Sequence, residues 1–236
     1  MRDEYETQYG RAAEDKEELP PRPAFLNRLW MVFVQPGDLF RQLALNPAWY
    51  PMAAFVAIVV ALSMWFIPVE AYDALMQARI PPEQAAEMPE IPPEFIRLTT
   101  IGGIAVVSFL FPLLLSLISY VIFVFIRGDD ASFKQHLSVM SHVGVITAVG
   151  SLFVMPLRMR SLDIEQVLSV GTFFQFLPDG FLLNMLSRID LFGLWACVVA
   201  GIGLSVIASR QKWGGTASIL VALLVVVAIV QALFTG

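Results

Sequence analysis

Long stretches without a charged residue constrain this chain more than any other feature. The longest, Leu98–Ile126, contains no Asp, Glu, Lys or Arg, and it exceeds the ~20 apolar residues with which a helix crosses ~30 Å of hydrocarbon. The whole chain is 57% hydrophobic and only 15% charged, against about 45–50% and about 25% in soluble domains. One soluble core of this size could not hide that surplus, so lipid is the expected solvent.

Five apolar stretches predict an all-α integral membrane protein, a five-span transmembrane helical bundle. The spans are expected at about 51–69, 98–126, 137–156, 191–209 and 213–234. Pro112 should kink the second span, because proline removes a backbone hydrogen bond. Residues 48–236, which contain these five ranges, are the expected membrane domain.

Two connecting segments need a separate interpretation. Glu70–Arg97 is rich in proline and acid, which predicts an extended or partly helical loop in water. Val167–Leu177 is apolar but ends at Pro178, and runs of about 10–14 apolar residues are more often interfacial or re-entrant than spanning. We expect an interfacial helical region here, and the sequence leaves open whether 167–187 is interfacial, re-entrant or spanning.

The N-terminal part is predicted to lie outside the bilayer. Residues 1–23 are acidic and proline-rich, a composition that favours a disordered tail. Residues 24–47 contain two amphipathic patterns separated by Pro36-Gly37, which predict two interfacial helices with Asn27 and Arg28 off the apolar face. Packing of these helices on the protein's own loops is the alternative, since periodicity does not separate the two.

The positive charges favour a cytoplasmic N-terminus. With that orientation, ten of the 15 Lys and Arg residues lie inside and five outside, in the direction of the positive-inside rule. The two short inside loops carry the clearest signal, Arg127 with Lys134 and Arg210 with Lys212. Five spans then place the C-terminus outside the cytoplasm.

No pattern of catalytic or ligand-binding residues is recognisable. The common phosphate-binding, metalloprotease and serine-hydrolase motifs are missing from the sequence, so no enzyme activity, cofactor, metal or nucleic-acid partner is predicted. His136 and His142 are six residues apart and face different sides of a helix. Each fits a polar contact, with a metal or proton-relay role as the alternative. His142 is the candidate intramembrane polar residue, because ionisable groups at membrane depth are functional candidates.

The fourth span carries small residues every four positions. Gly193, Cys197, Gly201 and Ser205 share one face, and small residues let membrane helices approach closely. We expect this flank to pack against another helix, either within the chain or in a partner. Asp190, just before it, can cap the first turn or contact a partner or an ion.

Three sequence stretches resemble the Yip-domain (Ypt-interacting protein) family, in its prokaryotic branch. They are Pro36–Phe40 followed by Asn46–Trp49, then Gly128 with Ser132–Gln135, and then Ile189–Trp195 with Gly201–Leu204. Asp190, Phe192 and Trp195 match the family's fourth-span signature. The resemblance implies five spans, a cytoplasmic N-terminus, no catalytic activity and, for this branch, the bacterial inner membrane.

The leading functional hypothesis is a membrane scaffold or accessory subunit for other membrane or transport proteins. Its expected partners are membrane lipid and other membrane proteins, and a homo-oligomer is left open. The contacts would come from Asp190, Phe192, Trp195 and the small-residue flank. The alternative is a small permease or channel, suggested by Pro112, His142 and a re-entrant Val167–Leu177.

Overall fold

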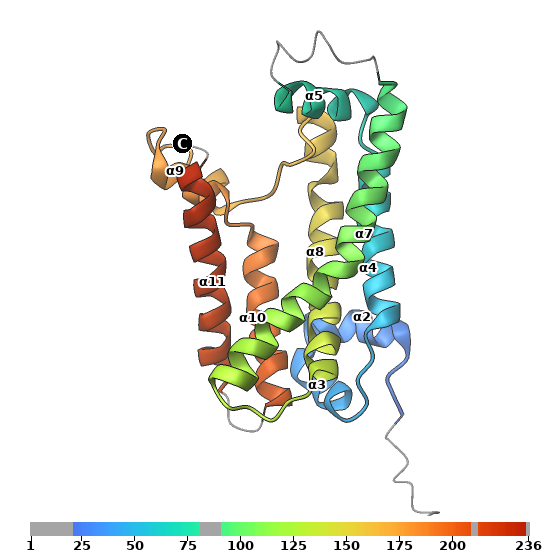
Figure 1. Cartoon of the computed structure of the whole chain (residues 1–236), viewed down its shortest axis with the longest axis vertical. Helices are drawn as coiled ribbons and strands as arrows, with labels where there is room; N and C mark the ends of the chain where they lie inside the picture. The colour runs from blue at the N-terminus through green and yellow to red at the C-terminus, as the bar shows by residue number, and fades with distance from the viewer. Residues whose placement is uncertain (1–20, 81–90, 209–211, 235–236) are drawn as a thin grey trace, which may run out of the picture.

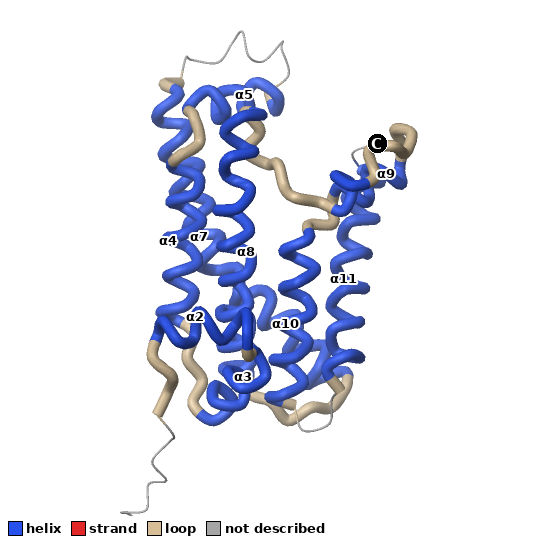
Figure 2. The backbone as a smooth tube through the Cα atoms, turned by 180° about the vertical axis from the view of Figure 1, so that it is seen from behind, coloured by secondary structure: helices blue, strands red, loops and turns tan. Residues whose placement is uncertain are grey.

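The computed structural model describes residues 21–80, 91–208 and 212–234, and it is helical through most of them. Figure 2 shows helices joined by loops, and the single β contact in these ranges is an isolated bridge between Ser169 and Asp190. The elements are α2 (Phe25–Val34), α3 (Pro36–Leu45), α4 (Tyr50–Trp65), α5 (Val69–Arg79), α7 (Pro93–Tyr120), the π-helix η1 (Val121–Ile126), α8 (Phe133–Ser161), the 3₁₀ helix η2 (Val170–Phe173), α9 (Phe181–Ser187), α10 (Leu191–Ile207) and α11 (Trp213–Phe234). The predicted all-α class is confirmed.

The long helices run between two ends of the molecule (Figure 1). Helices α4, α7 and α8 stand together, and α10 pairs with α11 beside them. Helices α2 and α3 lie at one end, and α5 and α9 lie toward the other. Helix α7 changes direction along its length in Figure 1, and Pro112 is the proline inside it, as expected for a residue that cannot donate to the preceding turn.

Length and composition identify three of the described helices as candidate membrane spans. They are Pro93–Ile126, Phe133–Ser161 and Trp213–Phe234, and α4 with α5 makes a fourth candidate that bends by 92°. Helix α10 is apolar but has only 17 residues. The structure therefore supports three or four spans directly, and the fifth stays a prediction.

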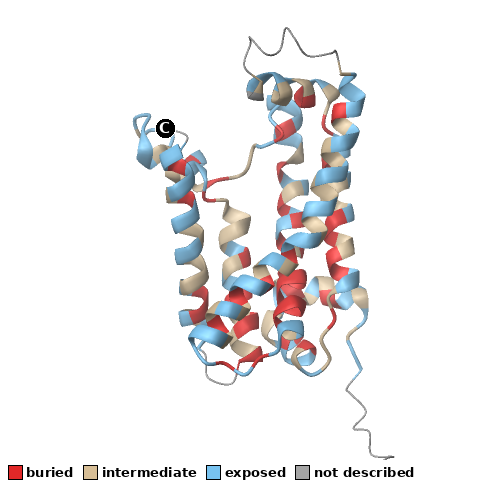
Figure 3. Cartoon of the chain, viewed as in Figure 1, coloured by how far each residue is buried: buried red, intermediate tan, exposed pale blue. Residues whose placement is uncertain are grey.

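Burial separates a central helix from peripheral ones. In the apolar window of α8, 67% of residues are buried, compared with 22% for the helix 93–126 and 17% for α11. Figure 3 shows the same contrast between the buried lower part of α8 and the exposed α11. Since exposed apolar side chains are unfavourable in water, the outer faces of α7 and α11 are surfaces for lipid.

The largest buried cluster lies where α3 meets α8 and α10. It includes Phe40 and Leu43 of α3, Val139 of α8, and Ala200 and Leu204 of α10. Close approach is built into it, because a Cβ atom on Gly203 would lie 2.7 Å from Val139 Cγ1 and 2.9 Å from the Phe40 ring. The N-terminal helices are thus packed on the bundle helices themselves, rather than on loops.

Helix α8 begins and ends at different residues from the predicted third span. Ser132 accepts a hydrogen bond from Gln135 N at 3.3 Å, and the Gln135 side chain accepts one from Ser132 N at 2.7 Å, so a capping box starts the helix. The helix continues beyond Pro156 to Ser161, where Leu162 adopts a left-handed conformation with φ 56°. Pro156 costs α8 one backbone hydrogen bond but does not end the helix.

The segments at the two ends differ in regularity. Part of Glu70–Arg97 is the helix α5, as the partly helical prediction allowed, and residues 81–90 lie outside the described ranges. Val167–Leu177 is less helical than expected, since it contains only the four-residue η2. The predicted disordered tail, 1–23, falls almost wholly in residues 1–20, which the structure does not describe.

Candidate functional site

A buried polar cluster joins α2 to the centre of the bundle. His142 of α8 is fully buried, its Nδ1 lies 2.7 Å from the Ser138 carbonyl oxygen, and its Nε2 lies 3.5 Å from Arg28 Nη1. A carbonyl oxygen accepts only, so Nδ1 carries the proton and Nε2 offers a lone pair to the arginine. The Ser138 backbone, not its side chain, satisfies this histidine.

Arg28 was predicted on the polar face of α2, and that prediction was wrong. Its side chain is 6% exposed and lies near the ring of Phe25, 5.6 Å from the ring centroid. Its Nε atom is buried without a hydrogen-bond partner among the described residues. Burial, and to a smaller extent the charge of Arg22, lowers the pKa of Arg28. Arginine remains charged despite such a shift.

The chain between α3 and α4 is tied to the same cluster. Ser138 Oγ donates to the Ala48 carbonyl oxygen at 2.9 Å and accepts from Ala48 N at 3.2 Å. Arg22 Nε donates to Asn46 Oδ1 at 2.7 Å. Segments far apart in the sequence therefore meet at one end of α8 around a pair of arginines.

His136 belongs to a different contact. It is 1% exposed, its Nδ1 lies 2.9 Å from Ser119 Oγ of α7, and its ring stands edge-on to Tyr120. The two histidines thus contact different helices, as their six-residue spacing predicted. Among the residues that the structure describes, no group of three or more His, Cys, Asp or Glu side chains is placed to hold a metal ion.

The small-residue flank of α10 lies mainly against α11. A Cβ atom on Gly201 would lie 2.5 Å from Ala217 Cβ, and one on Gly193 would lie 3.7 Å from Leu224 Cδ1. Cys197 and Ser205 are half-buried. The flank is therefore occupied within the chain, and whether it also contacts a partner stays a prediction.

Two aromatic residues of the fourth-span signature connect α10 to other helices. Phe192 packs so close to α8 that its ring atoms would lie 2.6–2.8 Å from a Cβ on Gly150. Trp195 meets Phe33 of α2 edge-on, with 5.3 Å between ring centroids, yet it remains 41% exposed. Trp195 is thus the signature residue that leaves an aromatic surface open.

Asp190 caps α10. Its Oδ2 accepts a hydrogen bond from Gly193 N at 2.9 Å. Desolvation by burial raises the pKa of this carboxyl above its ordinary value, and the hydrogen bonds from Gly193 and Phe192 and the charge of Arg158 act in the opposite direction without cancelling it. Of the two roles predicted for Asp190, helix capping is the one that these contacts support.

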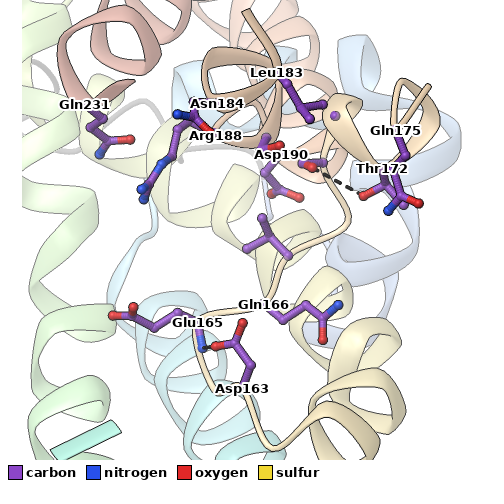
Figure 4. Close-up of a pocket in the computed structure, with 14 residues that line it drawn as sticks. Asp163, Glu165, Gln166, Thr172, Gln175, Leu183, Asn184, Arg188, Asp190 and Gln231 are labelled. Atoms are coloured by element: carbon purple, nitrogen blue, oxygen red, sulfur yellow. Dashed lines mark hydrogen bonds between the residues drawn. The ribbon is translucent and has the colours of Figure 1, made fainter. Parts of the chain in front are cut away.

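A polar cavity of about 640 Å³ adjoins Asp190 (Figure 4). It is lined by the 163–175 segment, α9 and Gln231 of α11, and its charged side chains are Asp163, Glu165, Arg188 and Asp190. Asp163 Oδ1 accepts from Glu165 N at 2.9 Å, which shapes one rim. Of these four charged residues only Asp190 was predicted as a candidate, because Asp163, Glu165 and Arg188 belong to no recognisable motif.

These features define an α-helical integral membrane protein with a polar cluster under its N-terminal helices. Residues 30–234 match the Yip1 domain. The chain belongs to the Yip1 domain family, which confirms the predicted relationship.

One curated relative is similar over nearly its full length. Membrane protein YknW of Bacillus subtilis (strain 168) is 24% identical over 212 residues, which cover 88% of this chain and 89% of that protein. No solved structure matches the chain.

Proposed function

We propose that this protein is a non-enzymatic membrane scaffold or accessory subunit that holds other membrane or transport proteins through helix and surface contacts. The observation that carries the proposal is an outward apolar stripe on α2. Leu26, Trp30 and Val34, four residues apart, are 73%, 67% and 47% exposed. The opposite face of α2 is held on α8, so the stripe is a built surface rather than a frayed end.

The aromatic surface extends from α2 to α10. Phe33 and Trp195 join the two helices, and Trp195 is part of the signature by which the sequence resembles its family. Exposed aromatic side chains are enriched where proteins meet partners. Membership of the Yip1 domain family supports contacts with other membrane proteins in general.

The proposed placement has five spans, with α4, α7 with η1, α8, α10 and α11 crossing the bacterial inner membrane. Helices α4 and α10 are the short members. Their 16 and 17 residues reach about 24 and 26 Å, and a bilayer accommodates a few ångströms of mismatch by local thinning. Helices α2 and α3 lie at the cytoplasmic interface, where the apolar stripe of α2 faces the lipid boundary and the membrane proteins that lie within it.

In-cell crosslinking tests the proposal. A photoreactive phenylalanine analogue at position 195 or 30 should yield crosslinked species of higher mass, whereas the same analogue at Val226, an exposed apolar position of α11 (54% exposed), should crosslink less. Purification in several mild detergents follows. Recovery of the protein alone and monomeric in all of them, with no position-specific crosslink, would contradict a scaffold or accessory role.

The small permease or channel gains no support from the described residues. Val167–Leu177 contains a single 3₁₀ turn, and His142 is enclosed by Arg28 and Ser138. We therefore keep one proposed function.

A further inference from the structure

The polar cavity beside Asp190 lies near the C-terminal end of α11, one of the candidate spans. Helix α11 begins at Trp213, an exposed aromatic residue of the kind that marks a membrane boundary. From there to Gln231, which lines the cavity, the helix rises by about 27 Å at 1.5 Å per residue. Because the hydrocarbon layer is about 30 Å thick, an α11 that crosses the bilayer places this cavity at the depth of the lipid headgroups.

The cavity is lined by charges of both signs on different sides. Figure 4 shows Arg188 with Asn184 and Gln231 on one side, and Asp163 and Glu165 across from them. Arg188, Asp163 and Glu165 are exposed, so a ligand can reach them. Arg188 forms no ion pair with any carboxylate that the structure describes. The arrangement suits a ligand that carries an anionic group and a cationic group.

The excess of negative charge and the chemistry of the lining narrow the ligand. Arg188 is the single cation among the lining residues, against Asp163, Glu165 and Asp190, so a ligand with an anionic group alone is disfavoured. No aromatic ring is among the lining residues, and aromatic cages are the surfaces that bind quaternary ammonium groups. A primary ammonium, with three N–H donors, fits the carboxylates better.

The segment that lines the cavity also exposes phenyl rings beside it. Thr172 and Gln175 line the cavity, whereas Phe173 and Phe176 do not and are 62% and 78% exposed. Helix α9, which forms another wall, packs against α11 and exposes Leu182. Since the outer face of α11 is a surface for lipid, acyl chains meet apolar side chains next to a polar cavity. A lipid is therefore the favoured source of the zwitterion.

We propose that this cavity binds the headgroup of a phospholipid with a primary ammonium group, a phosphatidylethanolamine, from the leaflet at the α9 end of the molecule. Arg188 donates to the phosphate oxygens, as arginine does in phosphate sites. Asp163 and Glu165 accept from the ammonium, and Phe173 and Phe176 contact the acyl chains. The site rests on α11 crossing the bilayer and not on the scaffold function, since no protein partner takes part.

Lipid binding to the purified full chain tests the site. Phosphatidylethanolamine, phosphatidylcholine and phosphatidylglycerol with the same acyl chains, and soluble glycerophosphoethanolamine, are added separately to delipidated protein in mild detergent. Native mass spectrometry counts the bound ligand, and the thermal unfolding midpoint reports whether each variant is folded. The variants are Arg188→Gln, Glu165→Lys and the pair Asp163→Asn with Glu165→Gln, in which the asparagine keeps an oxygen for the backbone N–H of residue 165. Arg160→Gln and Asp179→Asn are the matched controls, because both residues are exposed and neither lines the cavity.

The wild type and both controls should bind phosphatidylethanolamine alike. They should bind phosphatidylcholine and phosphatidylglycerol at least about tenfold more weakly, the size expected for one charge-assisted hydrogen bond. Arg188→Gln and the double variant should lose phosphatidylethanolamine by a similar factor, and Glu165→Lys should shift the preference toward phosphatidylglycerol.

Equal binding of phosphatidylethanolamine and phosphatidylcholine by the wild type would overturn the site, and this comparison needs no variant to fold. Undiminished binding of phosphatidylethanolamine by Arg188→Gln would overturn it as well. Glycerophosphoethanolamine that binds as tightly as the lipid would overturn the lipid assignment. None of these results bears on crosslinking at positions 30 and 195, so the site and the scaffold function fail separately.

Discussion

At Gly201 the backbones of α10 and α11 approach so closely that an added Cβ atom would lie 2.6 Å from Ala217 Cα. Gly201→Ala should therefore destabilise the protein by about 1–3 kcal/mol, the usual cost of overpacking a core. The measurement is thermal unfolding in detergent. Gly102→Ala on α7 is the control, because nothing lies within 4 Å of its added Cβ, and it should not lower the midpoint, since Ala favours a helix more than Gly does.

A double-mutant cycle sharpens this prediction. Gly201→Ala combined with Ala217→Gly should recover part of the loss, since one of the clashing atoms is then removed. Full stability of Gly201→Ala alone would mean that α10 and α11 do not meet here. In that case the small-residue flank would be free for a partner.

Asp190 gives a prediction about pH. Its pKa is raised by burial above the ordinary 3.8, so the folded state binds its proton more tightly than the unfolded state does. Stability from this group is therefore lost as pH rises from about 3.8 through the folded pKa. Asn caps a helix about as well as Asp, so Asp190→Asn should gain stability relative to the wild type over that same pH window.

Unfolding midpoints measured from pH 3.5 to 8 check this expectation. Asp179→Asn, a change at an exposed aspartate of the same connecting region, serves as the control and should follow the wild type. A difference between Asp190→Asn and wild type that does not vary with pH would show that capping geometry alone, and not desolvation of the carboxylate, matters at this position.

Arg28 shows what residue-level reasoning from sequence missed. A helical pattern assigns arginine to water because an isolated buried charge is costly. Arg28 contacts His142, which is 114 positions away in the sequence, and no local pattern predicts such a contact. By contrast, the cap at Asp190 depends on a residue three positions away, which is why it could be predicted.

At the scale of elements, the sequence predicted that α2 is amphipathic but not which of its faces lies on the bundle. Its bundle face holds Arg28 and Val32, whereas Leu26, Trp30 and Val34 point outward. If α2 lies at the membrane interface, nitroxide labels at 26 and 30 should be accessible to oxygen dissolved in lipid and protected from a water-soluble nickel reagent. Electron paramagnetic resonance in liposomes, in a Cys197→Ala background, gives both accessibilities.

A label at Asn27 provides the comparison for this experiment. Asn27 is exposed and polar and belongs to the same helix, so its label should be more accessible to nickel than the labels at 26 and 30. Equal nickel accessibility at all three positions would place the helix in water. The outward stripe would then need a protein partner rather than lipid to cover it.

Helix boundaries were predicted well where a cap or a charge marks them and poorly where tertiary contacts decide. Pro156 was taken as the end of the third span, but α8 continues to Ser161. Arg158 near that end donates to the Gln166 carbonyl at 2.8 Å and to Ser151 Oγ at 3.2 Å. These contacts hold the following loop on the helix, and a hydropathy pattern does not record them.

At the scale of the whole molecule, composition and hydropathy predicted an all-helical membrane protein because lipid demands helices with every backbone group paired. Composition does not decide whether a short helix crosses. Helix α10 has 17 residues and α4 turns by 92° into α5, so the number of spans depends on how the bilayer fits the ends. The polar cavity beside Asp190 could not be predicted from the sequence either, since it forms where the 163–175 segment, α9 and α11 come together.

The two ends of the molecule allow the number of spans to be tested directly. Figure 1 places α2, α3 and the C-terminal ends of η1 and α10 at one end, with α5 and α9 toward the other. If five helices cross and the N-terminus is cytoplasmic, reporter fusions after Arg127 and after residue 210 should both show a cytoplasmic signal. A fusion after Asp179, between η2 and α9, should show the opposite signal. Opposite signals at 127 and 210 would mean that α8 and α10 do not both cross. Arg127 precedes α8, Lys134 lies in its first turn, and Lys212 precedes α11, so replacing all three by Gln should weaken this orientation in the same assay. A topology indifferent to these charges would show that packing of α2 and α3 on the bundle fixes it instead.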